Sequence, residues 1–143
     1  MPIHSIEFRV YVHATEDRER VLRALKNIIP EYAWDEAEIV EETYQGHYGN
    51  PITVITVRIR GERAAKVLDD ILSRMSKGDK SILAGSIEER VDKEGTLYFR
   101  LSKQDAFLGR LILYEADDVV RISVSFTGKR REAVEDYKRR LEA

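Results

Sequence analysis

The chain has 143 residues, of which 43% are hydrophobic, and its formal net charge is −2. These values are typical of one globular domain and exclude a chain that is disordered throughout. The absence of cysteine excludes disulfides, cysteine-ligated zinc and thiol catalysis. No apolar run reaches the roughly 18 residues of a transmembrane helix, and the first residues lack the pattern of a signal peptide. We therefore expect a cytoplasmic protein without membrane contact.

Charged residues make up 35% of the chain, and methionine is scarce, as in many proteins from thermophiles. This composition predicts a thermostable protein. The net charge carries no overall signature of nucleic-acid binding. Residues 97–143 nevertheless hold 10 Lys and Arg against 8 Asp and Glu, with basic clusters at 129–131 and 138–140. Such charge runs are usually solvated faces of a helix, and the neighbouring acids Glu132, Glu135 and Asp136 favour that interpretation here.

The N-terminal half predicts strands and helices in alternation. Apolar and polar side chains alternate over residues 5–13, as in a half-buried strand. Thr15 is a candidate N-cap for the helix that follows, and Pro30 ends that helix. Two further strands then flank a glycine-containing loop, and a strongly amphipathic helix comes after them. These last three elements are expected at 38–45, 52–60 and 64–75.

The C-terminal half continues in shorter elements. Ser102 is a candidate N-cap for a short helix that begins at Lys103 and stops at Gly109. The other expected elements are a loop at 76–81, a short helix at 82–91, a turn at 93–95, strands at 96–101, 111–114 and 119–126, and a helix at about 129–142. Hairpins joined through amphipathic helices favour an α+β fold, with a mostly antiparallel sheet and helices packed on one face. We expect residues 1–143 to form a single domain.

The sequence shows no motif of a known catalytic or metal site. The three histidines do not have the spacing of metal ligands on a helix. No serine occupies a G-x-S-x-G elbow, and no glycine-rich phosphate loop precedes a helix. The pair Asp117-Asp118 is more typical of a turn between strands than of an acid–base site. We therefore expect a protein that is not an enzyme and needs no metal or cofactor.

The loop between the second and third strands is the first candidate site. It is long for a hairpin and rich in polar residues. Gly46 and Gly49 allow close backbone approach to a phosphate, and His47 and Asn50 can donate hydrogen bonds. Tyr44 and Tyr48 can stack on a base. A purely structural loop, in which glycine permits the turn and proline stiffens it, is an equally good interpretation.

The second candidate site follows the strand at 96–101. Arg100 stands at the end of that strand, and Lys103 and Gln104 lie in the first turn of the helix capped by Ser102. Helix-start N–H groups and two cations would form a compact anion site. A lysine at a helix start is locally unfavourable, and such conflicts tend to occur at functional sites. A simple capped turn is the alternative.

Together these motifs resemble the archaeal family of predicted exosome-subunit, RNA-binding proteins. The resemblance extends from about residue 6 to 126, and its segments are 46–52, 90–100, Lys103-Gln104, Gly109 and 117–121. It implies a small α+β domain similar to ribosomal protein L5 or to a double-stranded-RNA-binding fold, in an RNA-processing context. By motif, it assigns Gly46, His47, Gly49 and Asn50 to a signature loop. It assigns Arg100, Lys103 and Gln104 to a basic signature, followed by Arg121.

Our leading hypothesis is an exosome-associated accessory protein that binds RNA during processing or degradation and contacts its backbone and shape. Phosphates would be neutralised by Arg100, Lys103, Arg110 and Arg121. The complete set of candidate RNA-binding residues is Gly46, His47, Tyr48, Gly49, Asn50, Arg100, Lys103, Gln104, Arg110 and Arg121.

Two alternatives remain open at this stage. The acidic first two-thirds of the chain fits a protein-interaction module or a homodimeric adaptor better than it fits RNA binding. A hydrolase that uses His47 with a carboxylate is a weaker interpretation.

Overall fold

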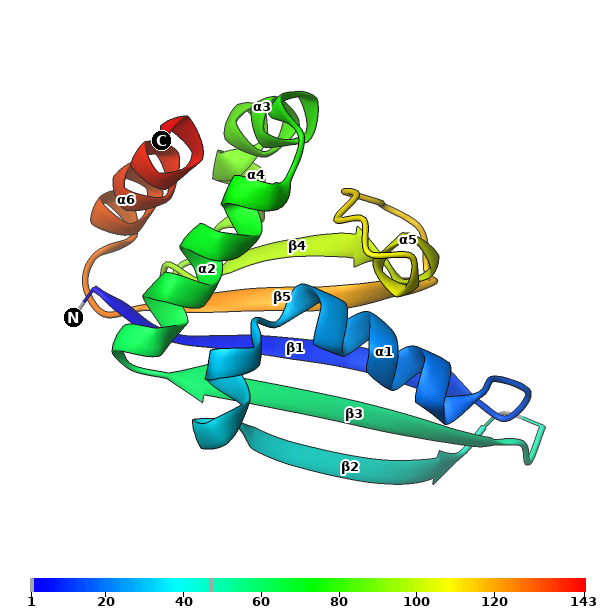
Figure 1. The fold of residues 1–143 in the computed structure, drawn as a ribbon. Coiled ribbons are helices and arrows are strands. Elements are labelled where there is room, and N and C mark those ends of the chain that lie inside the picture. Colours follow the sequence, from blue (N-terminus) through cyan, green and yellow to red (C-terminus); the bar gives the residue numbers. More distant parts are fainter. Residues whose placement is uncertain (1, 47) are drawn as a thin grey trace.

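The computed structural model describes residues 2–46 and 48–143. Five strands form one antiparallel sheet in the order β2-β3-β1-β5-β4 (Figure 1). The central strand β1 therefore pairs with two partners that come from opposite halves of the chain. The strands are β1 (Ile3–His13), β2 (Glu38–Gln45), β3 (Pro51–Arg60), β4 (Leu97–Ser102) and β5 (Val119–Phe126).

The helices cover one face of this sheet. In Figure 1, α1 and α2 cross in front of the strands, and α5 lies near the end of β4. The helical elements are α1 (Arg18–Ile28), η1 (Glu31–Glu36), α2 (Glu62–Arg74), α3 (Lys77–Gly85), α4 (Ile87–Arg90), α5 (Lys103–Phe107) and α6 (Arg130–Glu142). The predicted α+β class, with an antiparallel sheet and helices on one side, is confirmed.

Alternation along the strands separates a buried face from an open one. On β1, Phe8 and Val10 point toward the helices and are buried, whereas Arg9 points the other way and is exposed. The apolar faces of α1 and α2 pack on the buried side and form one continuous core with it. No helix of the described residues covers the other side, so polar side chains of the strands remain available there for binding.

Three predicted boundaries are wrong, each for a local reason. Helix α1 is capped by Asp17, whose side chain accepts a hydrogen bond from the Glu19 amide, and not by Thr15. The segment 76–81, expected as a loop, contains the N-cap Ser76 and the first residues of α3, because the Ser76 side chain accepts a hydrogen bond from the Asp79 amide. The segment 111–114 forms only an isolated bridge to β4, too short for a strand.

Helix α6 is fixed to the sheet by a buried tyrosine. The hydroxyl of Tyr137 lies 2.6 Å from the carbonyl oxygen of Gly95 and 3.1 Å from that of Val124. Burial raises the pKa of this hydroxyl, so it stays protonated and can donate. One side chain thus joins α6 to β5 and to the turn before β4.

We predict that Tyr137→Phe lowers the free energy of unfolding by about 1–3 kcal/mol, because buried carbonyls lose their donor. Urea denaturation followed by circular dichroism measures the change. The control is Tyr114→Phe at an exposed tyrosine, which should change stability by less than about 0.5 kcal/mol. Equal effects of the two substitutions would contradict the anchoring role.

Candidate functional site

The open face of the sheet carries a row of three arginines. Arg9 on β1 stands directly opposite Arg121 on β5, and Arg121 stands directly opposite Arg100 on β4. Residues in such cross-strand positions have Cβ atoms about 4.5–5.5 Å apart, and like charges there are destabilising. We call Arg9, Arg121 and Arg100 the arginine row. Its charge repulsion indicates that the sequence is not optimised for stability at this place.

The arginine row has no acidic partner among residues 2–46 and 48–143. The guanidinium of Arg121 lies over the ring of Tyr11, at 5.7 Å from the ring centre. On the neighbouring row of the same face, by contrast, Arg58 donates to Glu7 at 2.8 Å and is neutralised. The arginine row is therefore a local positive charge that suits an anion.

A hollow of about 340 Å³ lies beside the row over β1, β3 and β2. Its floor is formed by β3, and tyrosines flank it from β1 and β2. The lining residues are Arg9, Tyr11, Glu42, Tyr44, Ile52, Val54 and Thr56. The nearby carboxylate of Glu42 raises the pKa of Tyr44.

A second hollow of about 300 Å³ lies at the other end of the row, along the outer edge of β4. Arg100 and Arg121 line it together with Tyr98 from β4. An ion pair of 2.6 Å between Arg90 and Glu115 forms its outer wall. Burial and a hydrogen bond to Asp92 raise the pKa of Tyr98. The row thus has a tyrosine-containing hollow at each end.

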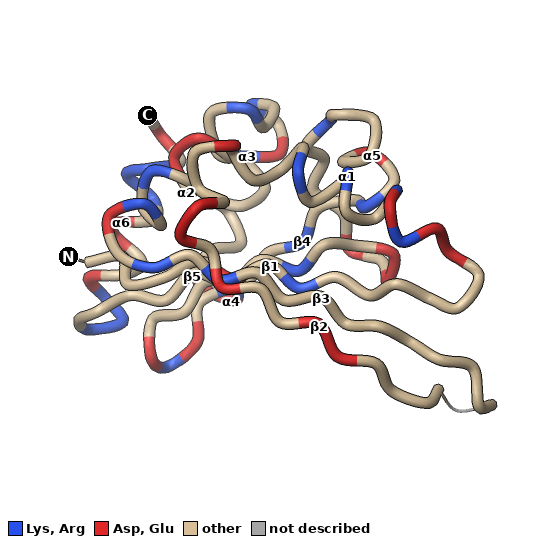
Figure 2. Tube along the Cα trace, turned by 60° about the horizontal axis from the view of Figure 1, so that its bottom comes forward, with Lys and Arg blue, Asp and Glu red and all other residues tan. Residues whose placement is uncertain are grey.

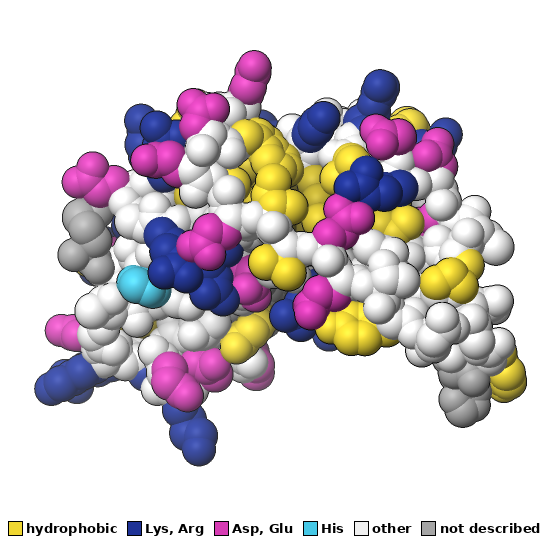
Figure 3. All heavy atoms as spheres, turned by 90° about the horizontal axis from the view of Figure 1, so that it is seen from below, with side chains coloured by type: hydrophobic (Ala, Val, Ile, Leu, Met, Phe, Trp, Pro, Cys, Tyr) yellow, Lys and Arg dark blue, Asp and Glu magenta, His cyan; other side chains and the backbone are white. Residues whose placement is uncertain are grey.

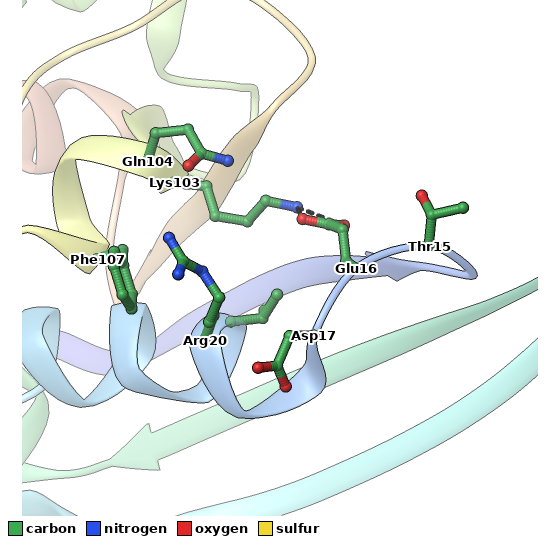
Figure 4. A pocket seen from close by; sticks show the side chains of 8 residues that line it. Thr15, Glu16, Asp17, Arg20, Lys103, Gln104 and Phe107 are labelled. Atoms are coloured by element: carbon green, nitrogen blue, oxygen red, sulfur yellow. Dashed lines mark hydrogen bonds and ion pairs between the residues drawn. The ribbon is translucent and has the colours of Figure 1, made fainter.

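Lys103 belongs to a different, internal site (Figure 4). Only 4% of the residue is exposed, and its ammonium points toward Glu16. The Nζ atom lies 2.8 Å from a Glu16 oxygen, 2.9 Å from an Asp118 oxygen and 3.0 Å from the carbonyl oxygen of Tyr11. The expectation that Lys103 neutralises phosphate is therefore not supported, because carboxylates already neutralise it.

The same cluster explains Gln104 and Asp118. The Gln104 amide donates to Asp118 at 3.0 Å. Burial alone would raise the pKa of Asp118, but hydrogen bonds from Gln104 and Lys103 outweigh it and lower that pKa. Gln104 and Lys103 hold the segment before β5 against the start of α5. Of the three residues in the predicted basic signature, Arg100 therefore lies on the open face, whereas Lys103 and Gln104 have a structural role.

The other predicted residues are spread over the molecule. Arg110 is exposed and pairs with Asp105 at 3.2 Å, outside the arginine row. In the β2–β3 loop, the Gly46 amide donates to the Asn50 carbonyl at 2.6 Å, and Gly49 has a φ of +83°. These contacts give the glycines a turn-forming role, and Tyr48 is highly exposed beside them. His47 lies outside the described residues.

Sequence reasoning missed Arg9, Tyr11 and Tyr98. The alternation of residues 5–13 already assigned Arg9 and Tyr11 to one face, which is the signal that could have found them. The register between β1 and β5 could not be predicted from the sequence, and it is this pairing that brings Arg9 opposite Arg121.

Comparison with known proteins identifies the family. The model of a family described as RNA binding matches residues 5–126. The chain belongs to this RNA-binding family. The match includes all three residues of the arginine row and both hollows.

Relatives and solved structures agree with this assignment. The RNA-binding protein PAB1135 of Pyrococcus abyssi is 40% identical over 137 residues, which cover 92% of this chain and 88% of that protein. The structure of Mth689, a DUF54 protein from Methanothermobacter thermautotrophicus, is 31% identical with a TM-score of 0.75, and 99% of each chain is covered. Protein AF2318 from Archaeglobus fulgidus is 27% identical with a TM-score of 0.81, and the match covers 96% of this chain and 99% of that one.

Within the described part of the chain, no helix is long and apolar enough to cross a membrane. The same residues contain no group of three or more histidine, aspartate or glutamate side chains placed to hold a metal ion.

We predict that Lys103→Met lowers the free energy of unfolding by about 2–3 kcal/mol. This is less than the loss for a fully buried pair, because Glu16 and Asp118 remain partly exposed. Urea denaturation measures the change, and Lys77→Met at an exposed position should stay within about 0.5 kcal/mol.

Acid titration gives an independent check of the same cluster. The pKa of Asp118 is lowered in the fold from its ordinary value of 3.8. Its contribution to stability is therefore complete above that value and is lost as the pH falls through the folded pKa. In Lys103→Met this acid-dependent loss should be smaller than in the unaltered protein. An unchanged pH profile would contradict the pairing.

Proposed function

We propose that the protein binds RNA through the open face of its sheet, with the arginine row in contact with phosphates. The main support for this proposal is that three arginines stand opposite one another on neighbouring strands and have no acidic partners among the described residues. Guanidinium groups bind phosphate through paired, charge-assisted hydrogen bonds. A bound phosphate backbone would also relieve the repulsion within the row. Membership of the RNA-binding family supports this assignment.

The basic clusters of α6 are a weaker phosphate site than the row. Arg130 and Arg140 are paired with Glu88 and Asp69 at 3.2 and 2.9 Å. Figure 2 shows basic and acidic positions mixed along most of the trace, with acidic ones on β2. Four of the six cations in these clusters, Arg130, Lys138, Arg139 and Arg140, have an acid within 4.0 Å. No such pair is found for the arginine row among the described residues, so a phosphate gains more electrostatic attraction there.

We further propose a role as an accessory protein of RNA processing or degradation, in association with the exosome and without catalytic turnover of its own. The support for this finer role is the resemblance of the 46–52 and 90–100 segments to the predicted exosome-subunit family. Affinity purification of the tagged protein from an archaeal lysate, with and without nuclease, tests it. Exosome subunits should be recovered, and their absence in both samples would contradict the association.

We predict that Arg121→Gln weakens RNA binding and reduces the slope of log K against log salt by about 0.7–0.9, the value for one lost phosphate contact. Arg121 is the most informative position, because it is the middle member of the row. Fluorescence anisotropy with a labelled RNA at several salt concentrations measures both quantities.

The matched control is Arg23→Gln, which removes the same charge from an exposed position on α1, on the other side of the sheet. It should leave the salt slope unchanged. Equal slopes for the two variants would exclude the open face as the phosphate site. No RNA binding at low salt would contradict the proposed function itself.

A second candidate function is a protein-interaction module or homodimer that uses strand β2. All eight residues of β2 are exposed, and as an edge strand it has backbone groups free to pair with another strand. Figure 3, which looks at the molecule from the side of β2 in Figure 1, shows hydrophobic side chains between acidic and basic ones. Ile39 and Val40 are half exposed there.

We predict that, if β2 mediates self-association, Val40→Lys shifts a dimer to the monomer, because lysine on an edge strand opposes pairing. Light scattering coupled to size-exclusion chromatography measures the mass. A protein that is already monomeric at all concentrations would exclude the homodimer.

A further inference from the structure

We propose that the open face binds single-stranded RNA, with the backbone on the arginine row and one base in each of the two flanking hollows. This inference rests on the proposed RNA-binding function and specifies the form of RNA. Three neighbouring strands contribute the row, so it spans about 10 Å across the sheet. The RNA would therefore cross the strands instead of running along them.

The hollow beside β2 has the chemistry of a base site. Its floor contains Ile52 and Val54, which offer apolar contact, and its walls contain Tyr11 and Tyr44. Tyr44 is 53% exposed although it is a large aromatic residue on a strand. Aromatic rings that remain exposed on a sheet are the platforms on which proteins stack unpaired bases.

The hollow beside β4 repeats this combination at the other end of the row. Tyr98 is 51% exposed and lies two residues before Arg100, on the same face of β4. Its hydroxyl is held by Asp92 at 3.1 Å, so the ring has a defined position before any ligand arrives. A ring fixed in this way loses little conformational freedom on binding.

Carboxylates decide which part of the RNA enters the hollows. Glu42 lines the first hollow, and Glu89 and Glu115 line the second. A carboxylate repels phosphate, whereas it accepts hydrogen bonds from the amino groups of bases. Phosphates are therefore favoured on the row between the hollows, and bases are favoured inside them.

A duplex does not match this arrangement. Its bases are paired and stacked inside the helix, so a protein reaches mainly phosphates and 2′-hydroxyls. The open face offers three arginines that have no acidic partner among the described residues, and two separate hollows lined by tyrosines. Only unpaired nucleotides can place bases into both hollows.

The test compares two RNAs of about twelve nucleotides: a labelled CA repeat, which cannot pair with itself, and its duplex with a UG repeat. Fluorescence anisotropy at one salt concentration should show at least about tenfold tighter binding of the single strand. Tyr44→Leu and Tyr98→Leu remove a stacking ring and should each weaken this binding by about five- to a hundredfold, with an unchanged salt slope.

The matched control is Tyr32→Leu, which alters a tyrosine of similar exposure (42%) on η1, outside both hollows. It should bind the CA repeat like the unaltered protein. Equal or tighter binding of the duplex, or unchanged binding by both tyrosine variants, would overturn the single-strand inference. In that case, a reduced salt slope for Arg121→Gln would still support the proposed function. Failure to bind either RNA at low salt would overturn both.

Discussion

The antiparallel register of β1 between β3 and β5 determines the open face. On one side, it aligns Glu7 with Arg58, and on the other it aligns Arg9 with Arg121. The first pairing joins opposite charges, and the second joins like charges. A shift of one residue would turn Arg9 into the core, so the apolar face of β1 holds this register strongly. The core therefore fixes an arrangement that electrostatics alone would disfavour.

Lys103 and the arginine row have contrasting roles in this protein. The Lys103 ammonium is enclosed and neutralised by Glu16 and Asp118, where it joins α5 to the turn after β1. The arginine row has no such partners within the described residues and lies on the face that no helix covers. The arginine row is thus available to bind an anion because no acidic side chain among the described residues pairs with it, whereas Lys103 is already paired.

Much of the fold could be predicted from the sequence, because periodicity reports local burial directly. The strands at 5–13 and 119–126 and the main amphipathic helices follow from such patterns. Short elements were less predictable. The start of α3 depends on one capping contact of Ser76, and the conformation of the 111–114 segment depends on its bridge to β4. The candidate site was recognised only in part, at Arg100 and Arg121. Arg9 completes the site by standing opposite Arg121, a residue more than a hundred positions later in the chain. A local sequence pattern cannot predict such a long-range pairing.

The most direct test of the account is a map of amide chemical-shift changes by nuclear magnetic resonance as a single-stranded RNA is added. We expect the largest changes at Arg9, Arg100 and Arg121 and at the tyrosines of the two hollows, with little change at Arg131 on α6. Changes concentrated on α6 or confined to β2, with the arginine row unaffected, would contradict the central claim.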